Sequence, residues 1–152
     1  MRIFKYLLAG AAIVTIAMAT TPAGYDPPKN SRQGIVFFEG SWEEALAEAK
    51  KQNKPIFLDA YASWCGPCKL MKARVFTNPE VGAFFNEHFV NYEMNMEKGI
   101  GPKVARNYGV TAYPTLFFLD PDGKILKRAV GYHHPEQLIE VGKLALSRHS
   151  GS

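Results

Sequence analysis

The segment Trp64-Cys65-Gly66-Pro67-Cys68 constrains this chain more than any other feature, because it holds both of its cysteines. It follows a nearly continuous apolar run at residues 55–61, a pattern typical of a strand covered on both faces. It opens a helical pattern over residues 69–76. Two cysteines separated by two residues at a strand-to-helix turn indicate a redox pair. The turn matters because the free N–H groups and the dipole at a helix start stabilise a thiolate.

Two other uses of the cysteine pair fit the sequence less well. A structural bridge here would close a loop with only two residues between the cysteines, and disulfide stabilisation grows with loop length. A zinc site needs about four ligands. The chain has only four histidines to add, and His133 and His134 are adjacent rather than three to five residues apart. We therefore expect no metal and no bound cofactor.

The order of the predicted elements is that of an α/β domain. Ser41 and Glu44 form a capping box that starts one helix, and a second box begins at Thr77. Alternating strands and helices followed by a hairpin predict a mixed sheet between helical layers, its first three strands parallel. The expected strands are residues 35–38, 55–61, 89–96, 115–120 and 125–130, and the expected helices are 42–53, 69–76, 78–85, 103–108 and one from His134 onward.

The first residues of the chain have the pattern of a targeting segment. Arg2 and Lys5 precede an apolar stretch at residues 6–19, which ends in the small-x-small signal Ala17-Met18-Ala19. The stretch is short for a membrane-spanning helix. We expect a signal peptide over residues 1–19, with an uncleaved anchor as the alternative, a linker over 20–34, a domain over 35–148 and a polar tail over 149–152. The protein would then be periplasmic or otherwise exported, or tethered to the outer side of the inner membrane.

The charge of the chain does not favour a nucleic-acid partner. The formal net charge is +4, from 18 basic and 14 acidic residues. Removing Arg2 and Lys5 with the predicted signal peptide leaves 16 basic against 14 acidic residues, or +2, and no run of five basic residues occurs. At 152 residues the chain is one ordinary domain, which we expect to be a monomer.

Four motifs, in order, resemble those of thioredoxin-fold proteins. They are Asp59, the run Trp64–Cys68, Tyr113-Pro114-Thr115, and Val130-Gly131. The resemblance covers roughly residues 36–146 and implies the thioredoxin fold. The segment Phe76-Thr77-Asn78-Pro79-Glu80 is similar to the exported group that includes the C-terminal domain of bacterial membrane thiol-disulfide reductases. One departure is Glu93, which aligns where thioredoxins usually carry a lysine.

Three residues are the expected catalytic set. Cys65, the first cysteine, lies nearest the helix start and is the predicted nucleophile. Cys68, one helical turn further, would resolve the mixed disulfide by attacking Cys65. Asp59 lies in an apolar strand, where loss of water raises the pKa of a carboxyl group. The resemblance implies that Asp59 accepts the Cys68 proton, and the alternative is an aspartate exposed at a strand end.

The remaining candidate residues surround the cysteines in the resemblance. It implies a cis bond before Pro114, which packs beside the cysteines, and a backbone at Ala112 or Tyr113 that pairs with an extended substrate segment. Trp64 and Tyr113 would form an apolar rim, with ordinary packing as the alternative for both. Gly66 and Pro67 would set a reducing potential and contact substrate. Lys69 and Lys72 are expected at solvated helix positions, with support of the thiolate as the alternative.

These observations predict an exported thiol-disulfide oxidoreductase that reduces disulfides in partner proteins. A membrane thiol-electron donor would return the electrons. Two alternatives stay open at this point: a disulfide oxidant or isomerase, and a non-catalytic thioredoxin-like binding module.

Overall fold

The computed structural model describes residues 34–151, so the predicted signal peptide and nearly all of the predicted linker lie outside the described residues. The helices are α1 (Trp42–Gln52), α2 (Gly66–Leu70), α3 (Pro79–His88), α4 (Gly101–Tyr108) and α5 (Pro135–His149), with a π-helical segment η1 (Met71–Val75) that continues α2. The strands are β1 (Ile56–Tyr61), β2 (Val90–Asn95), β3 (Thr115–Leu119) and β4 (Ile125–Val130).

The four strands form one mixed sheet in the order β2-β1-β3-β4. β1 and β2 are parallel, and Asp59 lies opposite Glu93 in their register. β3 is antiparallel to β1 and pairs with β4 in the predicted hairpin. The α/β class with a mixed central sheet is therefore confirmed.

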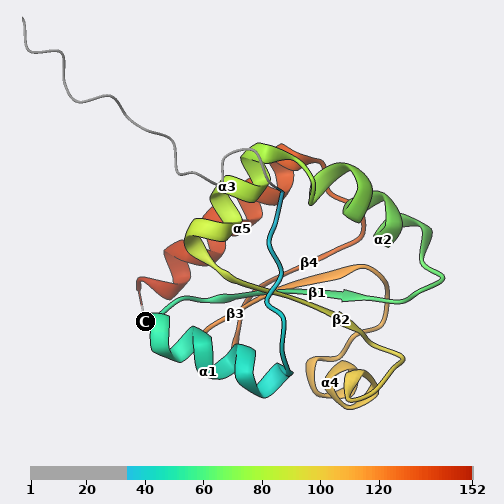
Figure 1. Cartoon of the computed structure of the whole chain (residues 1–152), viewed down its shortest axis with the longest axis horizontal. Helices are drawn as coiled ribbons and strands as arrows, with labels where there is room; N and C mark the ends of the chain where they lie inside the picture. The colour runs from blue at the N-terminus through green and yellow to red at the C-terminus, as the bar shows by residue number, and fades with distance from the viewer. Residues whose placement is uncertain (1–33, 152) are drawn as a thin grey trace, which may run out of the picture.

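Helices cover both faces of this sheet (Figure 1). Because neighbouring side chains on a strand point to opposite faces, β1 contributes to two cores. Ile56, Leu58 and Ala60 pack with α1 and α4. Phe57 packs on the other face, against η1, α3 and α5. Asp59 has the same orientation as Phe57, so its carboxyl group lies on the face that carries the helix of the cysteine motif.

The prediction of three parallel strands is wrong for residues 35–38, which form no strand of the described sheet. The segment lies extended beside β2, and side-chain amides replace most of the ladder hydrogen bonds. Val36 N donates to Asn86 Oδ1 at 2.8 Å, and Asn91 Nδ2 donates to Val36 O at 3.3 Å. Only Phe38 N makes a backbone bond to β2, to Asn91 O at 2.7 Å.

Two predicted helix boundaries also differ. The helix α3 is capped by Asn78, whose Oδ1 accepts from two backbone N–H groups, whereas the hydroxyl of Thr77 donates back to Ala73 O. The final helix continues through His149, because its last turns still pack Ala145 into the core. The capping box of Ser41 and Glu44 is confirmed. Within residues 34–151, no helix is long and apolar enough to cross a bilayer.

Candidate active site

The two cysteines form a disulfide at the start of α2. Cys65 is the N-cap residue, and its Sγ accepts a hydrogen bond from Cys68 N at 3.2 Å. Pro67 stands in the first turn, where its missing N–H group leaves no intrahelical hydrogen bond unmade. A sulfur in this position faces a backbone donor and the positive end of a helix, and both stabilise a thiolate. Both cysteine residues are only 2% exposed in this oxidised form.

Exposed residues surround the buried sulfurs. Trp64 is 68% exposed, and Gly66 and Pro67 are exposed beside it. The ring of Trp64 meets Tyr113 edge-on, with 5.9 Å between centroids. Its Nε1 donates to the carboxylate of Glu97 at 3.0 Å, a contact that the sequence does not predict. Trp64 and Tyr113 thus form one rim beside the disulfide.

The loop before β3 completes the site. The Tyr113–Pro114 bond is cis, as the resemblance implies. Tyr113 packs against the cluster of Cys65 and Cys68. The carbonyl of Pro114 accepts a hydrogen bond from Gly131 N at 2.8 Å, so the motif at Val130-Gly131 supports this loop. Gly131 has a φ of 89°, in the region that favours glycine.

Asp59 is fully buried, which excludes the alternative of an exposed strand end. Neither of its carboxyl oxygens has a hydrogen-bond partner in the described part of the chain. Loss of water raises the pKa of Asp59 to about 7, while the nearby Lys72 ammonium lowers it and the Glu93 carboxylate raises it. A carboxyl group with this proton affinity can take up or release a proton at neutral pH.

Lys72 and Glu93 form an ion pair near this buried acid, at the position where the family resemblance shows its departure. Lys72 Nζ lies 2.5 Å from Glu93 Oε2 and 4.0 Å from the centroid of the Tyr61 ring. The expectation of a merely solvated Lys72 is therefore wrong, since its ammonium group contacts Tyr61 on β1 and Glu93 on β2. Lys69, by contrast, is exposed.

The arrangement is suited to thiol-disulfide exchange: a redox pair at a helix start, a protonatable group on the sheet face that this helix covers, and an exposed aromatic rim. In the part of the chain that the structure describes, no group of three or more His, Cys, Asp or Glu side chains is placed to hold a metal ion.

Comparison with known proteins agrees with this reading of the site. The profile of the thioredoxin-like domain family matches residues 42–145. The chain belongs to the thioredoxin-like family. It is 29% identical to thioredoxin H2 of Arabidopsis thaliana, over 89% of this chain and 98% of that protein. It is 32% identical to the thiol:disulfide interchange protein DsbD of Citrobacter koseri, over 91% of this chain but only 24% of DsbD.

Solved structures show the same fold. A candidate disulphide-isomerase from Bacteroides thetaiotaomicron is 43% identical, with a TM-score of 0.67 over 75% of this chain and 94% of that one. The oxidised C-terminal domain of DsbD from Neisseria meningitidis is 26% identical, with a TM-score of 0.58 over 72% of this chain and 97% of that one. The thioredoxin fold is therefore confirmed, and the chain is a thiol-disulfide oxidoreductase with Cys65 and Cys68 as its bonded pair.

Proposed function

We propose that this protein is an exported reductase of disulfides in partner proteins. The observation that carries the proposal is the Cys65–Cys68 disulfide at the N-terminus of α2, with the dipeptide Gly66-Pro67 between the two sulfurs. The same dipeptide occurs in the thioredoxins that the chain resembles, and their couple is reducing, at about −270 mV.

The reaction begins with the reduced pair. The Cys65 thiolate attacks one sulfur of a substrate disulfide, so that a bond from Cys65 to substrate forms and the substrate S–S bond breaks. The other substrate sulfur leaves with the electron pair. Cys68 gives its thiol proton to Asp59 and attacks Cys65 Sγ, which releases the second substrate thiolate. The substrate has gained two electrons, and Cys65–Cys68 is left oxidised. A dithiol donor, which we place in the membrane, then reduces the pair.

The rim offers a place for the substrate chain. We assign substrate contacts to Trp64, Gly66, Pro67 and the loop from Ala112 to Pro114. The carbonyl of Ala112 already accepts a hydrogen bond from the Thr115 hydroxyl at 2.7 Å. The backbone of Ala112 or Tyr113 would then pair with an extended substrate segment, in the manner of strand addition.

Export is supported by the signal-like pattern of residues 1–19 and by the similarity to DsbD, whose name describes thiol:disulfide interchange. A full-length Cys68→Ser variant tests substrate, compartment and attacking residue together. Without Cys68 the mixed disulfide on Cys65 is not resolved, so covalent complexes accumulate and their partners are identified by mass spectrometry of the cell-envelope fraction. The matched Cys65→Ser variant is expected to trap nothing. Absence of adducts with the Cys68→Ser variant would contradict the proposal, as would trapping through Cys68 alone.

The direction of electron flow is tested by the reduction potential of the wild-type pair in glutathione buffers. We expect a value of about −270 mV, and a value above about −180 mV would favour the oxidant or isomerase. The isomerase alternative is the activity in the name of the Bacteroides structure. A doubly substituted Cys65→Ser, Cys68→Ser chain separates catalysis from binding, since a binding module would keep its full biological activity.

A further inference from the structure

Three ionisable groups from three elements gather on the sheet face that carries the helix of the redox pair. Asp59 on β1 and Glu93 on β2 are opposite one another in the parallel register. Lys72 reaches toward them from η1 and makes its ion pair with Glu93. Both oxygens of Asp59 lack a hydrogen-bond partner in the described residues. The Lys72 ammonium is thus near two carboxyl groups, and it pairs with that of Glu93, the more exposed of the two.

The position of the Lys72 ammonium is fixed from two sides. Its Nζ lies over the Tyr61 ring and against the Glu93 carboxylate. A cation over an aromatic face is attracted by the ring quadrupole, so Tyr61 adds to the hold of Glu93. Tyr61 and Asp59 are two residues apart on β1 and therefore share a face of the sheet. Lys72 is close enough to Asp59 to lower its pKa, yet makes no hydrogen bond with it.

We propose that Glu93 is a positioning residue for Asp59: by binding the Lys72 ammonium, it withholds from the buried carboxyl group the cation that would otherwise pair with it. The inference deepens the proposed function and rests on it for the role of Asp59 as proton acceptor. A carboxylate paired with a cation is a weak base, whereas an unpaired buried carboxyl group binds protons strongly. Glu93 therefore keeps Asp59 able to take the Cys68 proton.

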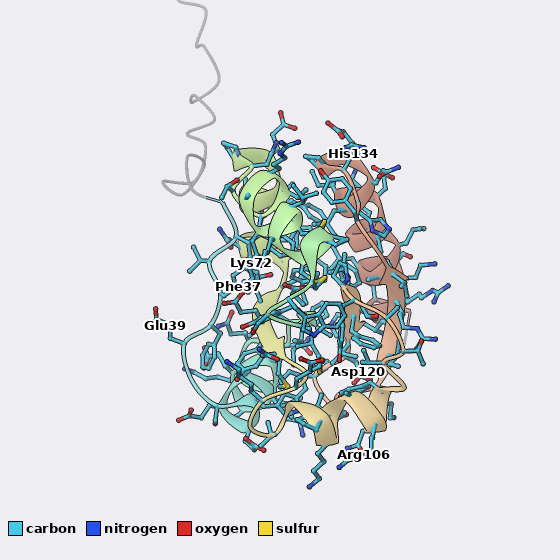
Figure 2. All side chains as sticks on the ribbon, turned by 90° about the vertical axis from the view of Figure 1, so that its right-hand side faces the viewer. Phe37, Glu39, Lys72, Arg106, Asp120 and His134 are labelled. Carbon is cyan, nitrogen blue, oxygen red and sulfur yellow. A yellow bond between two sulfur atoms is a disulfide. The ribbon has the colours of Figure 1, made fainter. Side chains whose placement is uncertain are left out.

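The ion pair has access to solvent, which explains why it forms with Glu93 rather than with Asp59. Lys72 and Glu93 line a cavity of about 340 Å³ together with Phe37 and its neighbours in the N-terminal segment. Lys72 and Phe37 lie close together in Figure 2, one from the helix and the other from the extended segment. Both charged side chains are a little over one-third exposed, so water still solvates them. Pairing Lys72 with the dry carboxyl group of Asp59 would cost more desolvation.

The other groups that face Asp59 add no competing charge in the oxidised protein. β3 places the apolar Leu116 opposite it. On the helical side, Cys68 is bonded to Cys65 and carries no titratable proton. The electrostatic surroundings of Asp59 in this state are therefore set by Lys72 and Glu93.

The test is a double-mutant cycle on the oxidised full-length protein, with the Asp59 carboxyl carbon titrated by ¹³C NMR. Glu93→Gln should lower the proton affinity of Asp59 at least tenfold, because Lys72 is released to pair with it. Lys72→Met should raise the affinity. In the Lys72→Met background, Glu93→Gln should have less than a third of its effect on the Asp59 pKa, since no cation remains to be released.

Equal shifts from Glu93→Gln in both backgrounds would overturn the proposal, because Glu93 would then act only by direct repulsion. No shift in either background would overturn it as well. The matched control is the exposed pair Glu140 and Lys143 on α5, 2.6 Å apart, whose Gln and Met variants should leave the Asp59 titration unchanged.

The pH profile of insulin reduction separates this inference from the proposed function. If the NMR cycle behaves as expected and the profile follows the Asp59 pKa, both stand. If the variants shift the Asp59 pKa as expected but leave the pH dependence of insulin reduction unchanged, Asp59 is not the proton acceptor. The positioning of Lys72 by Glu93 then still stands.

Discussion

Two buried polar residues on neighbouring strands have opposite surroundings. Asp59 on β1 has no hydrogen-bond partner for either oxygen within residues 34–151. Asn91 on β2, 3% exposed, donates from its amide nitrogen to Val36 O, Phe85 O and Asn86 Oδ1, at 3.2 to 3.4 Å. Buried polar groups in folded proteins are nearly always paired. The amide nitrogen of Asn91 obeys this rule and fastens the N-terminal segment to the sheet, although its Oδ1 has no partner among the described residues. Asp59, on the sheet face that carries the helix of the redox pair, breaks the rule with both oxygens. The difference teaches that the fold gives hydrogen bonds to the amide that fastens the chain and leaves the proposed proton acceptor without any.

The largest effect on this comparison is expected when a carboxyl group replaces the hydrogen-bond donor at position 91. Asn91→Asp buries a negative charge against three acceptors, which lose the N–H groups that Asn91 donates to them. We expect the free energy of unfolding at pH 8 to fall by about 4 kcal/mol, measured by urea denaturation. The loss should be smaller at pH 4, where a protonated carboxyl group can donate. Unchanged stability at pH 8 would show that Asn91 fastens nothing.

The second change removes the unpaired acid. The pKa of Asp59 rises from its unfolded value of 3.8 to about 7 in the fold. Its contribution to stability is therefore fully present below pH 3.8 and is lost as the pH rises through about 7. Between pH 5 and pH 8 we expect the wild-type free energy of unfolding to fall by about 2.5 kcal/mol more than that of Asp59→Asn.

Urea denaturation of the oxidised protein at several pH values measures this slope. Asp122→Asn is the matched control, because Asp122 is exposed in a surface pair with Lys50. It should keep the wild-type slope. If Asp59→Asn also keeps it, the carboxyl group of Asp59 is ionised throughout, contrary to our account of the site.

The smallest effect is expected for Asn95, which lies at the other end of β2 from Asn91. Asn95 donates to Ser63 Oγ at 2.7 Å and accepts from Glu97 N at 2.9 Å, but it is only partly buried. Water can replace both bonds, so Asn95→Ala should cost about 0.5 kcal/mol of unfolding free energy in urea. A loss as large as the one expected for Asn91→Asp would mean that burial does not distinguish the two residues.

Much of the site could be predicted because its residues are close in sequence or belong to recognisable motifs. The two cysteines, the helix start and the buried run around Asp59 all lie within residues 55–76. The cis bond at Pro114 was predicted only from the family resemblance, since spacing carries no signal for it.

Contacts between distant side chains could not be predicted. Lys72 and Glu93 are 21 residues apart, and their pairing depends on how η1 packs on the face of the sheet that carries Phe57. Glu97 and Trp64 are 33 residues apart, and a glutamate after a strand gives no signal for an indole partner. The sequence of residues 35–38 has the composition of a strand, but the amides of Asn86 and Asn91 took the hydrogen bonds that a strand would have made.

The near-complete cover over both sulfurs decides which molecules can reach them. Cys65 and Cys68 are each 2% exposed, and Tyr61 and Tyr113 pack against them. A thiol on the surface of a folded protein contacts the aromatic side chains of the rim before it reaches a sulfur. An extended peptide segment, by contrast, can lie along the rim. Under the proposed function, the shape of this rim favours an extended segment over a folded surface as the substrate.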